Sequence, residues 1–260
     1  MSLIAFRVQI ERHFMITSFF AGFSYVFKGF SLITKKGVRS YVLIPLLINI
    51  AVFSVAIYIG FSQFSGWLEH LLASISWLPD WLEVAIQWLM MPLFSLLILV
   101  AVYYSFTIVA NLIAAPFNSQ LALRAEGQLL GKDVAAIEDQ STMMALTKRT
   151  VASEFKKMSH MIKWLIVLLI LTVIPVVNII APFAWLIYSA WMLAIEYADY
   201  PMGNHNLMFK EGVQHLKRQR FASLGMGAGL MLIAAIPVVN FLAMPVGVAA
   251  GTTLWVKRLS

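Results

Sequence analysis

The chain contains four long stretches that lack Asp, Glu, Lys and Arg. They cover residues 41–68, 84–123, 164–195 and 221–256, and they are 28, 40, 32 and 36 residues long. A helix needs about 20 apolar residues to cross the ~30 Å hydrocarbon layer of a bilayer. Each stretch can therefore reach deep into lipid, and the pattern predicts an integral membrane protein built from helices.

The composition points the same way. Of the 260 residues, 61% are hydrophobic and 12% are charged, whereas about 25% of the residues in a soluble domain are charged. This balance excludes a soluble enzyme. The chain has no cysteine, which excludes disulfides, thiolate metal sites and a thiol nucleophile.

The basic residues are unevenly distributed, and their distribution predicts the topology. The segment 61–83 has no Lys or Arg but carries three acidic residues. Because loops rich in Lys and Arg stay in the cytoplasm, this segment is expected to face away from it. Two transmembrane helices follow from that placement, one at 41–62 and one at 84–114.

The two later apolar stretches are interrupted near the middle by the same pentapeptide. Ile-Pro-Val-Val-Asn occupies residues 174–178 and again residues 236–240. The arms on either side have about 14 to 18 residues and reach only ~21 to 27 Å at ~1.5 Å per residue. We expect two re-entrant helical hairpins, at 164–195 and 221–256. Two other interpretations stay open: full spans through a thinned bilayer, and Pro and Asn that merely cap tight turns between packed helices.

The remaining segments complete the predicted fold. Residues 1–40 contain a Phe-rich amphipathic stretch, which is typical of an interfacial helix. Residues 115–163 are the most polar region and are expected to form a cytoplasmic helical extension that turns near Gly131. The sequence thus predicts a single all-α membrane domain over residues 1–260, with two long transmembrane helices, two partly inserted hairpins and an N-terminal amphipathic helix.

Catalytic signatures are absent from the sequence. It contains no Walker-type loop, no zinc-protease His-Glu-x-x-His, no nucleophile-elbow motif and no dinucleotide fingerprint. Its five histidines are scattered, and only His205, near Glu196 and Asp199, could join a polar cluster. We therefore expect no catalytic residue, no metal site and no cofactor, and no ATP-driven transport by this chain alone.

A short polar segment directly before the first predicted crossing is the best candidate for chemistry. It consists of Lys36, Gly37, Val38, Arg39 and Ser40. A glycine lets the backbone approach a ligand, the amides at a helix N-terminus bind anions, and an arginine adds a planar fork of donors. The segment suits a tetrahedral dianion. It is also compatible with a basic cluster that fixes topology or touches anionic lipid.

Polar residues near the apolar stretches are candidates for a conduction path. Asn178 and Asn240 lie at the two repeated breaks, and Asn111 precedes a similar Pro-containing segment. Glu196 and Asp199 follow the first hairpin and could pair with arginines or lie at the mouth of a path. A solvated helix end before a Pro turn explains these two carboxylates equally well.

The chain resembles the CysZ-type sulfate permease family of bacterial inner membranes over nearly its full length. The matching motifs are spread from the first turn to the end of the chain. They are Gly37-Val38-Arg39 with Leu43-Ile-Pro45-Leu-Leu-Ile-Asn49, Ala110-Asn-Leu-Ile-Ala-Ala-Pro-Phe-Asn118, Ser189-Ala-Trp-Met-Leu-Ala-Ile195, Tyr197-Ala-Asp-Tyr-Pro201, Asn204-His205 and Met244-Pro245-Val246.

The resemblance implies multi-pass insertion in the inner membrane, assembly as a homo-oligomer, and sulfate uptake for assimilation into cysteine. It also implies sulfate binding at Gly37, Val38 and Arg39, and this chain has Ser40 where some members have a second arginine. The expected partners are sulfate and the lipid bilayer, and no nucleic acid. The alternatives are a channel or permease for another oxyanion, such as sulfite or thiosulfate, and a membrane scaffold that transports nothing.

Overall fold

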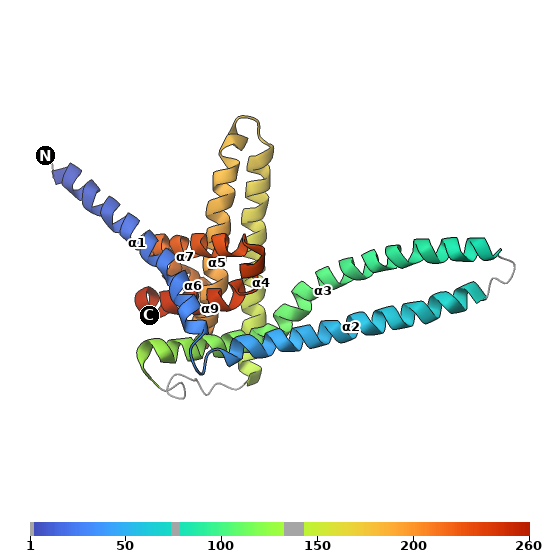
Figure 1. Cartoon of the computed structure of the whole chain (residues 1–260). Helices are drawn as coiled ribbons and strands as arrows, with labels where there is room; N and C mark the ends of the chain where they lie inside the picture. The colour runs from blue at the N-terminus through green and yellow to red at the C-terminus, as the bar shows by residue number, and fades with distance from the viewer. Residues whose placement is uncertain (1–2, 74–78, 133–142) are drawn as a thin grey trace. The chain divides into compact units, whose positions relative to one another are not determined.

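The structure is a computed structural model that describes residues 3–73, 79–132 and 143–260. Within the helices, side chains are not described for 3–13, 101–115 and 143–156, nor at several single positions. The described residues are helical and include no strand, as the sequence predicts (Figure 1). The elements are α1 (Leu3–Ile33), α2 (Ser40–Ala73), α3 (Asp80–Leu130), α4 (Met143–Val173), η2 (Val177–Ile179), α5 (Ala181–Asn204), α6 (Phe209–Arg218), α7 (Arg220–Ala234), α8 (Pro237–Asn240), α9 (Ala243–Leu254) and η3 (Trp255–Leu259).

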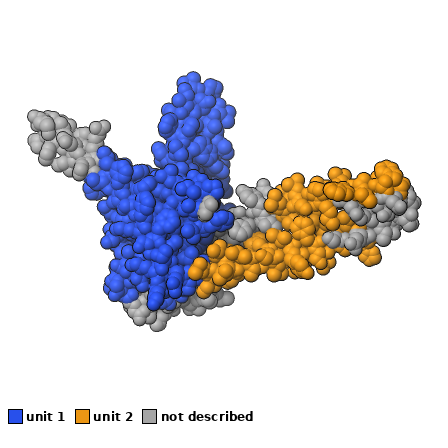
Figure 2. All heavy atoms as spheres, in the orientation of Figure 1, with its two compact units in different colours: residues 1–42, 118–260 blue, residues 43–117 orange. Residues whose placement is uncertain are grey.

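The chain divides into two compact units, which are described separately. One unit comprises residues 1–42 together with 118–260, and the other comprises residues 43–117 (Figure 2). Residues far apart in the sequence therefore belong to the same unit, because the chain leaves the first unit after residue 42 and returns to it at residue 118. This division places the turn before α2 in the same unit as the end of α3.

The smaller unit is a hairpin of apolar helices. The ring of Phe64 in α2 stacks on that of Phe94 in α3, with 3.4 Å between centroids, and Phe61 meets Phe94 edge to face. Most of the large apolar side chains in this unit are exposed. The span Ser40–Leu68 has 29 residues and is long and apolar enough to cross a membrane. The described apolar part of α3 runs over Val84–Val100.

A second helix meets the same criterion of length and composition. Within α1, Phe14–Ile33 forms a 20-residue apolar segment. The Phe-rich amphipathic pattern of residues 1–40 predicts an interfacial helix for this region. Its length alone fits either placement.

The larger unit is built around α1, α5, α7 and α9, which pack against one another (Figure 1). Small residues allow the close approach. A Cβ added at Gly225 in α7 would collide with the backbone carbonyl of Phe19 in α1, and one added at Gly227 would collide with that of Ala190 in α5. Met226 and Leu230 are almost completely buried at this junction. These contacts hold α1, α5 and α7 together, and α4 and α6 pack against α5.

Both helix interruptions fall at the repeated pentapeptide. Helix α4 ends at Val173 and α5 begins at Ala181, with Val176 at φ 71° between them. Helix α7 ends at Ala234 and α9 begins at Ala243. Proline lacks an amide donor and disfavours helical geometry at the preceding residue, so each helix ends before it. The α4–α5 arms expose many apolar side chains, whereas α9 is buried in the core of its unit.

Candidate anion-binding site

The turn between α1 and α2 is held by its own backbone and by one buried side chain. The amides of Val38 and Arg39 both donate to the carbonyl oxygen of Lys35, each at 3.1 Å. The side chain of Val38 is completely buried against Leu121, Ala122 and Val248. Val38 thus anchors the turn to the end of α3 and to α9.

Gly37 occupies the exposed corner of this turn at φ +84°. Among the described residues its amide has no acceptor, whereas the Val38 amide is already engaged with Lys35. The side chains of Lys36, Arg39 and Ser40 are exposed around it. The predicted site residues therefore form one continuous polar turn, in which Gly37 supplies the open amide.

The turn opens onto a cavity of about 310 Å³. Two loop residues and one face of the last turns of α3 line it. The lining residues are Gly37, Val38, Arg124, Gly127, Gln128, Gly131 and Lys132. Helix α3 ends at Leu130, Gly131 takes φ +63°, and the Lys132 amide donates to the Gly127 carbonyl at 3.1 Å. This is a Schellman-type helix end, in which glycine adopts the left-handed conformation. The expected turn near Gly131 is present.

Arg124 is one of two cationic residues that line the cavity, with Lys132, and it is not among the site residues predicted from the sequence. Its guanidinium carbon lies 5.7 Å from the centroid of the Tyr41 ring, a cation–π arrangement. Its Nε is buried and has no hydrogen-bond partner among the described residues. The four-residue spacing of Arg124 and Gln128 shortly before Gly131 was the available signal, because residues four apart share one helix face.

The carboxylates predicted at the end of the first hairpin are paired. Lys157 Nζ in α4 lies 2.7 Å from Glu196 Oε2 and 3.6 Å from Asp199 Oδ2 in α5. The Lys157 side chain is buried. The cationic partner is a lysine on the neighbouring helix rather than the arginines considered from sequence.

Asn178 and Asn240 are not among the residues that line the cavity. Asn178 in η2 and Asn240 at the end of α8 are exposed at the tips of their hairpins. Asn111 lies within α3, but its side chain is outside the described residues. The role of Asn178 and Asn240 in a conduction path stays a prediction.

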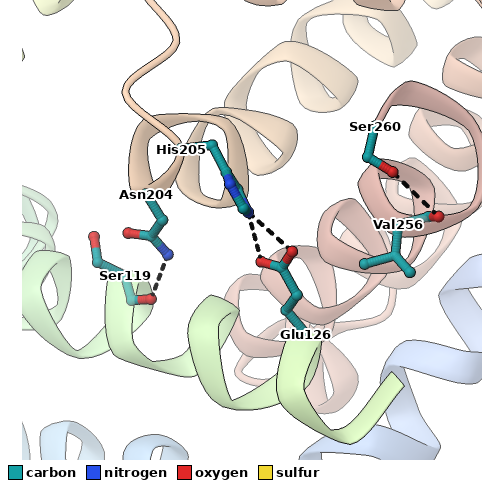
Figure 3. Close-up of polar contacts among 6 residues, drawn as sticks. All are labelled: Ser119, Glu126, Asn204, His205, Val256 and Ser260. Atoms are coloured by element: carbon teal, nitrogen blue, oxygen red, sulfur yellow. Dashed lines mark hydrogen bonds and ion pairs between the residues drawn. The ribbon is translucent and has the colours of Figure 1, made fainter. Parts of the chain in front are cut away.

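His205 pairs with a residue that the sequence did not suggest. Its Nε2 lies 2.9 Å and 3.0 Å from the two carboxylate oxygens of Glu126, and Asn204 Nδ2 donates to the Ser119 carbonyl (Figure 3). The Glu126 side chain is 4% exposed. These contacts join the end of α5 to the final turns of α3, and so they position the helix that carries Arg124.

The described residues are helical, and two of their helices are long and apolar enough to cross a bilayer, as helical membrane proteins require. Residues 25–245, which include the whole cavity lining, match the family described as Sulfate transporter CysZ/Etoposide-induced protein 2.4. The chain belongs to this family.

Several curated proteins named Sulfate transporter CysZ are similar to this chain, including the following three. The protein from Pseudomonas aeruginosa strain PAO1 is 39% identical over 238 residues, covering 92% of this chain and 95% of the relative. The one from Pseudomonas syringae pv. tomato is 41% identical over 237 residues, covering 91% and 92%. The one from Pectobacterium atrosepticum is 37% identical over 242 residues, covering 92% and 85%.

Proposed function

We propose that this chain is a sulfate permease of the inner membrane, which takes up sulfate for assimilation into cysteine without an ATPase of its own. The relatives named as sulfate transporters align with more than nine-tenths of the chain. The observation that carries the proposal is the exposed Gly37 turn, which opens onto a cavity lined by two cationic residues.

The chemistry of the turn suits sulfate. Sulfate carries two negative charges and four acceptor oxygens, so it needs several donors and partial neutralisation. The Gly37 amide is open, the Arg39 guanidinium offers a planar fork, and Lys36 and Ser40 add an ammonium and a hydroxyl. The Val38 amide can also donate to sulfate if it gives up its hydrogen bond to the Lys35 carbonyl.

The proposed membrane arrangement is the one the sequence predicts. Two helices cross at 41–62 and 84–114, the segments 164–195 and 221–256 form re-entrant hairpins, and a single membrane domain assembles as a homo-oligomer. The shortness of α7 and α9 supports partial insertion, because 15 and 12 residues reach only ~22 and ~18 Å at ~1.5 Å per residue. Sulfate would pass the hairpin tips around Asn178 and Asn240.

A binding experiment tests the site. Radiolabelled sulfate is bound to purified parent protein, to Arg39→Ala and to Arg218→Ala, which removes an exposed arginine at the end of α6. A charge-assisted hydrogen bond contributes roughly 1.5 to 3 kcal/mol, so we expect Arg39→Ala to weaken binding about tenfold or more. Arg218→Ala should bind like the parent.

Competition by unlabelled anions tests selectivity among oxyanions. Unlabelled sulfate should displace the label at lower concentration than sulfite or thiosulfate. If sulfite or thiosulfate were the better competitor, the assignment of sulfate as substrate would be wrong, but the assignment of the Gly37 turn as the binding site would be unaffected. Equal binding by the parent and Arg39→Ala would instead overturn the assignment of the turn.

A further inference from the structure

The buried Nε of Arg124 is the least explained polar group in the larger unit. It has no hydrogen-bond partner, and no ion pair to Arg124 occurs among the described residues. Buried donors in folded proteins are almost always satisfied, so an unpaired buried donor on a residue that lines a cavity points to a ligand or water at that residue. The Arg124 guanidinium also lies over the Tyr41 ring, 5.7 Å from its centroid.

The helix face around Arg124 is shaped for close approach. Gln128 follows it by one helical turn on the same face, and Gly127 leaves that face without a side chain. Gly131 and Lys132 line the cavity just beyond the end of α3 at Leu130. A Cβ added at Gly37 or Gly131 would meet no atom within 4 Å. The cavity of about 310 Å³ corresponds to roughly ten water molecules at ~30 Å³ each, which is room for a hydrated oxyanion.

The charge balance of this cavity favours an anion. The carbonyl end of α3 carries partial negative charge. Two basic residues flank it, because Lys132 follows the helix end and Arg124 lies in its last two turns. Its lining contains no carboxylate among the described residues. A second cavity of about 400 Å³ uses the opposite face of α3 and contains the Glu126 carboxylate with His205. Of these two cavities, the first contains Arg124 and Lys132 without a carboxylate in its described lining.

We propose that Arg124, in contact with the Tyr41 ring, is the residue that makes the sulfate site prefer a dianion to a monoanion. In this arrangement the dianion lies between the Gly37 amide and the Arg124 guanidinium, and Lys132 and Gln128 complete its shell. The inference rests on the proposed function and extends it, because it assigns discrimination between dianions and monoanions to a residue 85 positions from Arg39 in the sequence.

The test compares sulfate with perchlorate, a tetrahedral monoanion, in equilibrium binding to purified full-length protein. The variants are Arg124→Gln, Arg124→Lys and Lys132→Gln, with Arg218→Gln as the matched control. Loss of the Arg124 charge should weaken sulfate about tenfold or more and perchlorate by clearly less. Arg124→Lys should fall between the parent and Arg124→Gln, because it keeps the charge and loses the planar fork.

The outcomes separate this inference from the proposed function. If the parent binds and transports sulfate while Arg124→Gln and Lys132→Gln bind it as tightly, the inference fails and the function stands. If Arg124→Gln weakened the binding of sulfate and of perchlorate equally, Arg124 would have only a structural role, and the inference would also be overturned. A parent that neither binds nor transports sulfate would overturn both. Should Arg124→Gln not fold, as judged by gel filtration, unchanged sulfate binding by both Arg124→Lys and Lys132→Gln would overturn the inference.

Discussion

Gly37 and Gly131 have φ values of +84° and +63°, and they line the same cavity. They are the two glycines with positive φ among the described residues. Gly37 lies in the turn before α2, and Gly131 follows the end of α3. Two residues with left-handed backbone therefore line the cavity without side chains. Side chains larger than hydrogen would strain both corners.

The first prediction concerns the backbone at Gly37. Gly37→Ala should weaken sulfate binding severalfold, because a left-handed alanine costs about 1–2 kcal/mol and shifts the open amide. Gly203→Ala is the control, since this glycine has open space and no positive φ. Sulfate titration of both variants checks the prediction, and equal affinities would contradict it.

The second prediction concerns packing between α7 and α1. Gly225→Ala should lower the unfolding temperature markedly, because its Cβ would collide with the Phe19 carbonyl. Overpacking of this kind typically costs about 1–3 kcal/mol. Thermal unfolding in detergent is the measurement, with Gly66→Ala as control because that position is open. A Gly225→Ala variant as stable as the control would show that the helices are not packed this closely.

The third prediction concerns the Lys157 pair that joins α4 to α5. Lys157→Met should destabilise the protein by roughly 1–3 kcal/mol. This is less than for a fully buried ion pair, because the Glu196 side chain is 40% exposed and solvent screens its charge. Adding Glu196→Gln should recover part of the loss, since the unpaired carboxylate is then removed. A double-mutant cycle measures this coupling. Strictly additive effects would mean that the two residues do not interact energetically.

The fourth prediction concerns alkaline pH. Burial raises the pKa of Tyr200 above its ordinary value of 10.0, and the hydrogen bond from Asn118 opposes this in part. The folded state therefore keeps the phenol proton more tightly than the unfolded state. The stability from this group is complete below pH 10 and is lost as pH rises above it. Tyr200→Phe should flatten the fall in unfolding temperature above about pH 10, and an unchanged slope would contradict the pKa direction.

Local features of the fold could be predicted from sequence. The apolar stretches indicated helices, and proline with a repeated pentapeptide indicated where α4 and α7 end, because both signals depend on a few neighbouring residues. The same holds for Gly37 and Gly131. Their role as corners follows from their own backbone freedom.

Contacts between distant segments could not be predicted. Arg124 meets Tyr41, Lys157 meets Glu196, and His205 lies 79 residues from Glu126. Each pairing depends on how α3, α4 and α5 pack, and no spacing within one helix encodes it. The sequence therefore predicted the Gly37 turn but missed the residues at the end of α3 that line the cavity beside it.

The most direct test of the account is sulfate flux into proteoliposomes that contain this chain alone. Radiolabelled sulfate should enter vesicles with the parent protein faster than empty vesicles, without ATP, and Arg39→Ala should reduce the initial rate strongly at low sulfate concentration. Correctly inserted parent protein that gives no flux above empty vesicles would contradict the assignment of this chain as a sulfate permease.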